Sequence, residues 1–169
     1  VVIIKSLQKQ KNNLKKFSTK LSSNYAFNSN YILSICLFDF GAKANIEREL
    51  EKRGCKVTVV PFDTTAEKVI SMKPDGIMLS NGPGDPAENV GVIEEIRKLC
   101  EWNKEIVGSS PTMTGKPIPI FGICLGHQML SLARGAKTCR LKYGHRGGNH
   151  PVKDVKSGRV YITSQNHGY

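Results

Sequence analysis

From residue 31 onward, apolar runs of strand length alternate with amphipathic segments of helix length, and this alternation constrains the fold more than any other feature. Such a pattern is typical of βαβ units on a parallel sheet. We therefore expect an α/β fold with an open, mostly parallel sheet and helices on both of its faces. Strands are predicted at 31–38, 56–60, 76–80 and 117–123, and helices at 44–53, 65–72, 90–102 and 129–134.

The helix ends carry recognisable signals, whereas the rest of the chain is less regular. Thr64 or Thr65 is expected to cap the helix at 65–72, and Gly54 and Gly135 are expected to end helices. The polar stretch 103–115 is predicted to be an insertion between a helix and a strand. After the last helix the alternation stops, and two further strands are predicted at 138–143 and 159–163.

The net charge of +11 is distributed unevenly along the 169 residues. Residues 1–30 hold six Lys and no acid, residues 31–133 hold 11 basic and 13 acidic residues, and residues 134–169 hold eight basic residues and one acid. We expect residues 1–30 to be a basic, polar and poorly ordered tail, and residues 31–169 to be one domain. No nucleic-acid partner is expected, because no zinc-finger spacing, aromatic RNA-stacking motif or basic heptad accompanies the charge.

The cysteines and the apolar runs of the sequence indicate the cellular compartment of the protein. Five cysteines at long, irregular spacings, with no CxxC pair, argue against a disulfide framework and against a metal site. A reduced, cytoplasmic protein is therefore expected. The longest apolar run, 31–38, is far shorter than the roughly 20 residues that cross a bilayer, so no membrane partner is expected. Because the sequence begins at Val1 rather than Met, we expect a fragment of a longer protein.

The strongest functional signal is the sequence G-I-C-L-G at 122–126, which has the form G-x-C-x-G between a predicted strand and a predicted helix. This is the cysteine version of a nucleophile elbow, in which glycines two residues before and after the nucleophile make room for a strained turn. The amides and the positive dipole end of the following helix favour a thiolate. Cys124 is therefore predicted to be a catalytic nucleophile, with a small buried hydrophobe as the alternative. The other four cysteines are expected to be inert.

Two further loops are predicted at the carboxyl ends of strands, where open α/β sheets bind ligands. The loop 80–86 holds two Gly and two Pro, so a ligand can approach its backbone closely and its amides can serve an oxyanion. The loop 164–169 offers side-chain amides and a glycine backbone, with an ordinary turn as the alternative. Gln128 lies one helical turn after Cys124 and is predicted to contact the ligand. His127 points to another side of the helix and is not expected to be the general base.

Four motifs together resemble those of the class I (triad) glutamine amidotransferases over about residues 35–169: D-F-G-A-K at 39–43, S-N-G-P-G-D-P at 80–86, F-G-I-C-L-G-H-Q at 121–128 and Y-G-H-R-G-G-N-H-P at 143–151. All but the third resemble the branch that serves carbamoyl phosphate synthesis. The resemblance implies a flavodoxin-like fold, L-glutamine as the substrate and a glutamyl thioester on Cys124. It also implies a large synthetase subunit, or a fused synthetase domain, as the partner. No cofactor is implied in this domain, whereas the partner would use ATP and Mg²⁺ to join the ammonia to bicarbonate for arginine or pyrimidine synthesis.

The same resemblance assigns roles to individual residues. It implies two oxyanion donors, Gly84 and the amide of Leu125, and four residues that hold the glutamine, which are Gly82, Gln128, Asn166 and Gly168. The family's catalytic His and Glu lie in a downstream G-H-P-E segment, which this sequence does not reach before Tyr169. We therefore expect the fold to be truncated at its C-terminus and the chain alone to hydrolyse negligible glutamine. The family's amino-terminal small domain is expected to have no counterpart in residues 1–30.

Two other functions stay open on the sequence alone. One is a non-catalytic, amidotransferase-like binding module that docks a partner through its basic carboxyl-terminal third. The other is a cysteine hydrolase that acts on a different amide or ester.

Overall fold

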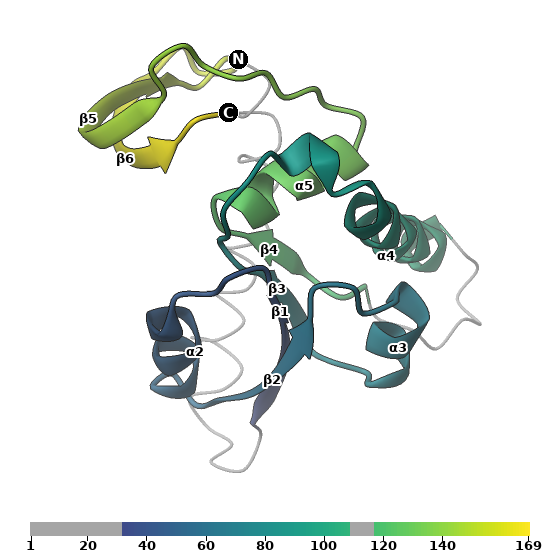
Figure 1. Cartoon of the computed structure of the whole chain (residues 1–169). Helices are drawn as coiled ribbons and strands as arrows, with labels where there is room; N and C mark the ends of the chain where they lie inside the picture. The colour runs from purple at the N-terminus through teal and green to yellow at the C-terminus, as the bar shows by residue number, and fades with distance from the viewer. Residues whose placement is uncertain (1–31, 109–116) are drawn as a thin grey trace. The chain divides into compact units, whose positions relative to one another are not determined.

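The structure is a computed structural model that describes residues 32–108 and 117–169, so the tail predicted at 1–30 lies outside the described residues. The described chain divides into two compact units, one that ends at Gly135 and one that runs from Ala136 to Tyr169. Figure 1 shows the helices and strands of both units.

The first unit is built around a four-stranded parallel sheet with the strand order β2-β1-β3-β4. Its strands are β1 (Leu33–Asp39), β2 (Cys55–Pro61), β3 (Gly76–Leu79) and β4 (Ile120–Gly122). The strand β1 pairs with β2 on one side and with β3 on the other, and Leu37 lies opposite both Val59 and Met78. Because both faces of β1 are covered, its apolar run is buried at nearly every position. The predicted α/β fold with a parallel sheet is confirmed.

The helices lie on both faces of this sheet, as the alternation predicts. They are α2 (Ala44–Glu51), α3 (Ala66–Ser71), α4 (Val90–Gly108) and α5 (Leu125–Ala133), with a 3₁₀ turn η1 (Pro86–Glu88) before α4. Figure 1 shows α2 on one face and α3 and α4 on the other, while α5 packs against α4 and the ends of β3 and β4. The largest fully buried apolar side chains include Phe38, Leu79, Ile96, Leu99 and Met129.

Three of the predicted helix ends are confirmed. Thr65 precedes α3, and its side chain accepts a hydrogen bond from the backbone N–H of Lys68 at 3.3 Å. Gly54 and Gly135 follow α2 and α5 with φ values of +79° and +84°. This left-handed conformation is the one that favours glycine at a helix C-terminus.

The helix α4 is longer than predicted, because it runs to Gly108 instead of ending at Trp102. The predicted insertion at 103–115 is therefore wrong for its first part, and residues 109–116 lie outside the described residues. Asn103 makes two hydrogen bonds of 2.8 Å to the backbone of Ile118, one through each side-chain amide atom. Those bonds hold the end of the helix beside the segment that leads into β4. Although α4 has 19 residues, no described helix is both long enough and apolar enough to cross a membrane.

The second unit is an antiparallel hairpin of β5 (His145–Lys153) and β6 (Val160–His167). Its turn is organised by Asp154, whose carboxylate accepts hydrogen bonds from the N–H of Lys156 at 3.0 Å and the hydroxyl of Ser157 at 2.7 Å. The backbone N–H of Asp154 also donates to the carbonyl of Arg159 at 2.7 Å.

Two predictions for this unit are wrong. Residues 138–143 form no strand, although the N–H of Leu141 donates to the carbonyl of Gly168 at 2.8 Å. Residues 164–167, predicted as part of a loop, belong to β6. The reason is that β5, with Gly147, Gly148 and Pro151, carries residues that disfavour strands and yet supplies the ladder for β6.

Candidate active site

Cys124 occupies a strained turn between β4 and α5. Its backbone has φ 51° and ψ −111°, and a positive φ is uncommon for a residue with a side chain. It is the N-cap residue of α5, and its side chain is exposed. The thiol therefore stands at the end of a strand, beside the first turn of a helix and open to solvent, so the alternative of a buried hydrophobe is wrong.

The two glycines around Cys124 are sterically required. A Cβ atom placed on Gly122 would lie 2.6 Å from the backbone of Gly126 and of His127. A Cβ atom placed on Gly126 would lie 2.4 Å from the carbonyl oxygen of Leu79. Because both obstructions are main-chain atoms, no side-chain rotation relieves them. The explanation of the G-x-C-x-G pattern as a turn too tight for side chains is confirmed.

Hydrogen bonds fix the elbow to the end of the neighbouring strand β3. The N–H of Ile123 donates to the carbonyl of Leu79 at 3.0 Å, and the N–H of Gly126 donates to the carbonyl of Ser80 at 3.1 Å. One turn further along the chain, the N–H of Gln128 donates to the carbonyl of Cys124 at 3.0 Å. The turn at Cys124 is thus held from both sides, by β3 before Cys124 and by the helix after it.

The loop 80–86 leaves β3 beside this elbow. At Gly82 a Cβ atom would lie 2.1 Å from the carbonyl oxygen of Phe40 and 2.8 Å from the side chain of Leu125, so only glycine fits. Gly84 has φ +97° and open space around its Cα atom. The backbone of Gly82 therefore packs against Leu125, which follows Cys124, while Gly84 stands at the open side of the same loop.

A second loop, between β1 and α2, braces the loop 80–86. The side chain of Asn81 accepts a hydrogen bond from the N–H of Lys43 at 3.1 Å and donates one to the carbonyl of Gly41 at 3.2 Å. Asp39 accepts bonds from the N–H groups of Ala42 at 2.8 Å and Gly41 at 2.9 Å, and these bonds lower the pKa of its carboxyl. The motifs at 39–43 and 80–86 thus form one backbone framework at the carboxyl ends of β1 and β3.

The predicted site residues divide between the two units. The first unit places Gly82 and Gly84 on the loop beside the elbow, and Cys124 and Leu125 on the elbow itself, with Gln128 one turn along α5. Asn166 lies on β6 and Gly168 directly after it, both in the second unit, so their place beside the nucleophile stays a prediction. The ring nitrogens of His127 are buried, whereas the thiol of Cys124 is exposed.

Reasoning from the sequence gave Ser80 no role of its own and placed it only where the strand 76–80 meets the loop 80–86. The structure buries this residue completely, with 0% of its surface exposed. A usable signal was present, because a serine directly follows the apolar strand and directly precedes a glycine-rich turn.

The other cysteines differ in their exposure. Cys36, Cys55 and Cys100 are buried, and burial raises the pKa of Cys36 to about 11 and also raises the pKa of Cys55. A raised pKa disfavours the reactive thiolate, as expected for inert thiols. Cys139 is exposed, so no burial protects it.

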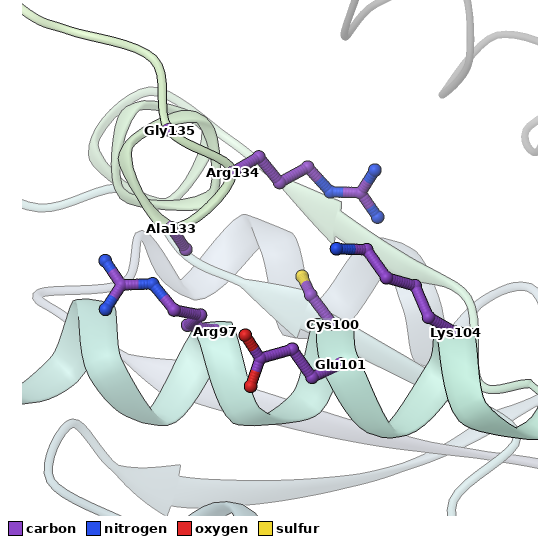
Figure 2. Close-up of a pocket in the computed structure, with 7 residues that line it drawn as sticks. All are labelled: Arg97, Cys100, Glu101, Lys104, Ala133, Arg134 and Gly135. Carbon is purple, nitrogen blue, oxygen red and sulfur yellow. The ribbon is translucent and has the colours of Figure 1, made fainter.

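A cavity of about 260 Å³ lies at the opposite end of α5 from Cys124. Figure 2 shows the side chains of Arg97 and Lys104 on α4, and of Arg134 after α5, around this cavity. Neither the elbow nor the loop 80–86 lines it, so the cavity is separate from the candidate site. In residues 32–108 and 117–169, no group of three or more His, Cys, Asp or Glu side chains is arranged to hold a metal ion.

Comparison with known proteins gives a consistent set of relatives. The sequence model of the family described as glutamine amidotransferase class-I matches residues 36–169. The carbamoyl phosphate synthase small chain of Staphylococcus saprophyticus is 51% identical over 166 residues, which are 98% of this chain and 40% of that protein. The proteins of that name from Staphylococcus epidermidis and Bacillus cereus are 56% and 53% identical, and the matches cover 81% and 80% of this chain and 33% of each relative. The chain therefore spans 33–40% of the length of these relatives.

The alignment with the Staphylococcus saprophyticus protein also reaches the amino-terminal segment. Since it covers 166 of the 169 residues, it includes most of residues 1–30. Whether this segment matches the family's amino-terminal small domain stays a prediction, because the coverage alone does not say which part of the relative it matches. Among solved structures, a GMP synthase protein from Thermoplasma acidophilum is 27% identical with a TM-score of 0.48, and the match covers 71% of this chain and 54% of that one.

Proposed function

Because the chain belongs to the class-I glutamine amidotransferase family, we propose that it is the glutamine-hydrolysing part of a carbamoyl phosphate synthase small subunit. One observation carries the chemistry, namely an exposed cysteine on a strained turn whose flanking glycines tolerate no side chain. The relatives that are 51–56% identical support this branch of the family, since all carry that subunit's name.

In the proposed reaction, the thiolate of Cys124 attacks the carbon of the side-chain amide of L-glutamine. The amide oxygen becomes an oxyanion, which the N–H groups of Leu125 and Gly84 bind. Collapse of this intermediate restores the carbonyl, and the nitrogen leaves as ammonia after it takes up a proton. Water then hydrolyses the glutamyl thioester, which releases glutamate and regenerates the thiol.

The position of Cys124 at the N-terminus of α5 supports these roles. Leu125 is the first residue of the helix, where backbone N–H groups have no intrahelical acceptor. The positive end of the helix dipole favours negative charge on both the sulfur and the oxyanion. The strand-to-helix turn therefore provides a backbone N–H that can donate a hydrogen bond to an anion next to the proposed nucleophile.

The remaining roles follow the family pattern. Gly82, Gln128, Asn166 and Gly168 hold the amino-acid portion of the glutamine. Proton transfer falls to a His and its partner Glu in a G-H-P-E segment, which the 169 residues do not contain. The ammonia passes to the large synthetase subunit or a fused synthetase domain, where ATP and Mg²⁺ support its reaction with bicarbonate. The product feeds arginine or pyrimidine synthesis in the cytoplasm.

Labelling with a glutamine-shaped chloroketone tests the proposal. We expect this reagent to alkylate Cys124, and we expect L-glutamine to protect the thiol. Cys139 is the matched control, because it is also exposed but lies on no elbow. Iodoacetamide should alkylate both thiols, whereas the chloroketone should spare Cys139. Replacement of Cys124 by Ser should abolish glutamine-protected labelling, and Cys139→Ser should leave it unchanged.

Other outcomes of this experiment favour other functions. If the chloroketone labels both exposed thiols equally and glutamine has no effect, a binding module without a glutamine site is favoured. If Cys124 reacts faster than Cys139 with iodoacetamide but is ignored by the glutamine reagent, a hydrolase for another amide or ester is favoured. Either result would overturn the glutaminase proposal.

A further inference from the structure

We infer that Ser80 is a positioning residue that fixes the Gly82–Gly84 rim beside the nucleophile elbow. The inference rests on the proposed function, because that function gives this rim the task of binding the substrate and its oxyanion. The hydroxyl of Ser80 acts on the rim through the backbone and takes no part in the chemistry itself.

The backbone of Ser80 joins two segments of the site. Its N–H donates to the carbonyl of Phe38 at 3.3 Å, at the end of β1. Its carbonyl accepts the N–H of Gly126 at 3.1 Å, in the first turn of α5. Since Ser80 is 0% exposed, water does not compete for these groups. The residue therefore sits at the junction of β1, β3 and the elbow.

The side chain of Ser80 adds a third connection. Its Oγ atom accepts a hydrogen bond from the N–H of Phe40 at 2.9 Å and donates one to the carbonyl of Asn81 at 2.8 Å. A hydroxyl has a single hydrogen to donate, so the bond to Asn81 fixes its direction. Both hydrogen-bonding functions of this buried hydroxyl are used within the site framework.

The second of these bonds orients the peptide group that leads into Gly82. The carbonyl of Asn81 belongs to that peptide, so the hydroxyl of Ser80 sets the orientation of its plane. Gly82 in turn packs against the carbonyl of Phe40, where a Cβ atom would lie 2.1 Å away. Phe40 thus donates its N–H to Ser80, while its C=O lies directly against Gly82. Without the hydroxyl, this peptide plane loses its direct hydrogen bond, and the side-chain bonds of Asn81 and the packing of Gly82 are left to hold the rim.

Ser34 provides a matched control at the other end of the sheet. Its hydroxyl also makes two hydrogen bonds, one to the carboxylate of Asp75 at 3.1 Å and one from the N–H of Asp75 at 3.3 Å. Ser34 lies near the start of β1, whereas the site lies beyond the end of that strand. Replacement of either serine by Ala removes two bonds, but only Ser80→Ala releases the rim.

The experiment compares two alkylation rates at Cys124 in the full chain. The glutamine-shaped chloroketone needs the rim, because its carbonyl oxygen becomes negatively charged as the thiolate adds to it, whereas iodoacetamide needs only an accessible thiolate. The rate constant for the chloroketone divided by that for iodoacetamide is expected to fall by about tenfold to a hundredfold in Ser80→Ala. The same ratio is expected to fall by less than about twofold in Ser34→Ala. A ratio in Ser80→Ala within twofold of the wild type, or an equal loss in Ser34→Ala, would overturn the inference.

Ser80→Thr keeps the test decisive if Ser80→Ala does not fold. Threonine retains the hydroxyl, so its ratio is expected to stay within about threefold of the wild type. A folded Ser80→Thr protein in which this rate ratio falls tenfold would also overturn the inference. Failure of the proposed function has a different signature, because wild-type Cys124 would then show no glutamine-protected labelling at all.

Discussion

At the scale of single residues, Cys124 combines an exposed thiol with a backbone torsion that raises the free energy of the folded state. A non-glycine residue at such a φ costs on the order of 1–3 kcal/mol, and surrounding contacts must hold it there. Here the hydrogen bonds from Ile123 and Gly126 to the end of β3 supply that restraint. The strained torsion thus occurs at a cysteine that is exposed.

Replacing Cys124 by Gly is expected to give a more stable protein than replacing it by Ala, by about 1 kcal/mol. Glycine adopts a φ of 51° without strain, whereas alanine keeps the strained torsion. Both variants lack the thiol, so the difference in the free energy of unfolding in urea reports the backbone alone. An Ala variant as stable as the Gly variant would show that the turn stores no strain.

The steric requirement at the elbow is tested by Gly126→Ala. This change places a Cβ atom 2.4 Å from the carbonyl of Leu79, so we expect a loss of more than about 2 kcal/mol in the free energy of unfolding. Gly91→Ala in α4 is the control, because a Cβ atom there meets nothing within 4 Å. Helix propensity predicts that this control is neutral or up to about 1 kcal/mol more stable. Equal stability of the two variants would contradict the packing described for the elbow.

At the scale of elements, the short helix α3 depends on groups outside it. The helix has six residues, too few to be stable in isolation. Its first N–H groups are satisfied by the side chain of Thr65 and by the carboxylate of Glu95 on α4, which accepts the N–H of Ala66 at 2.7 Å. The contact with α4 therefore stabilises the start of α3.

Glu95 makes the junction between α3 and α4 sensitive to pH. The hydrogen bond from Lys98 and then the one from the N–H of Ala66 lower the pKa of its carboxyl. A carboxyl with a lowered folded-state pKa adds stability above its unfolded pKa of about 4.3 and loses it as the pH falls through the folded value. Glu95→Gln is thus expected to flatten the pH dependence of the free energy of unfolding below about pH 5.

Glu94→Gln serves as the control for that titration, because it removes an exposed carboxylate from the same turn of α4. The side chain of Glu94 is 48% exposed, compared with 19% for Glu95, and it pairs with Arg97 at the surface. Urea unfolding at several pH values between 3 and 7 measures both variants. A pH profile of Glu95→Gln that matches the wild type would refute the capping role.

The elements that the sequence predicted correctly are those with strong local signals. The βαβ order, the Thr65 cap and the glycine helix ends all follow from residues within a few positions of each other. The sequence did not predict the extension of α4. Hydrogen bonds between Asn103 and Ile118 accompany this extension, and they join residues 15 positions apart that a local pattern does not connect. The strand β5 was missed because its glycines and proline disfavour a strand, and only pairing with β6 explains it.

The candidate site shows the same division. The short pattern around Cys124 was enough to predict the strained turn, because its steric demand is local to residues 122–126. The sequence could mark Ser80 as a serine between an apolar strand and a glycine-rich turn, but it could not give the partners of Ser80, because Phe38, Phe40 and Gly126 come from other parts of the chain.

At the scale of the whole molecule, the residues that the family pattern assigns to glutamine hydrolysis are distributed over two units. Cys124 and the Gly82–Gly84 rim belong to the unit that ends at Gly135, and Asn166 and Gly168 belong to the hairpin unit. The polypeptide also spans only 33–40% of the length of its relatives. Glutamine hydrolysis therefore requires more groups than alkylation of the Cys124 thiol, which depends mainly on the unit that ends at Gly135.

Glutamine hydrolysis by the purified chain 1–169 is expected to be negligible. Release of ammonia requires proton transfer, and the His–Glu pair proposed for that step is not in the sequence. An assay of ammonia release, with Cys124→Ala as the blank, measures this directly. Substantial turnover that disappears in Cys124→Ala would show that another residue of this chain acts as the base.

The hydrogen bonds and close packing between the elbow and the end of β3 have a consequence for protein engineering. A designer who grafts only the pentapeptide 122–126 onto a new scaffold omits the two carbonyl oxygens, of Leu79 and Ser80, that keep the bend from relaxing. The graft needs the end of the adjoining strand as well. It must also keep the short distance between Gly126 and the carbonyl of Leu79, which leaves no room for a methyl group. The smallest transplantable unit is therefore a pair of strand ends, and a library that varies one must vary the other with it.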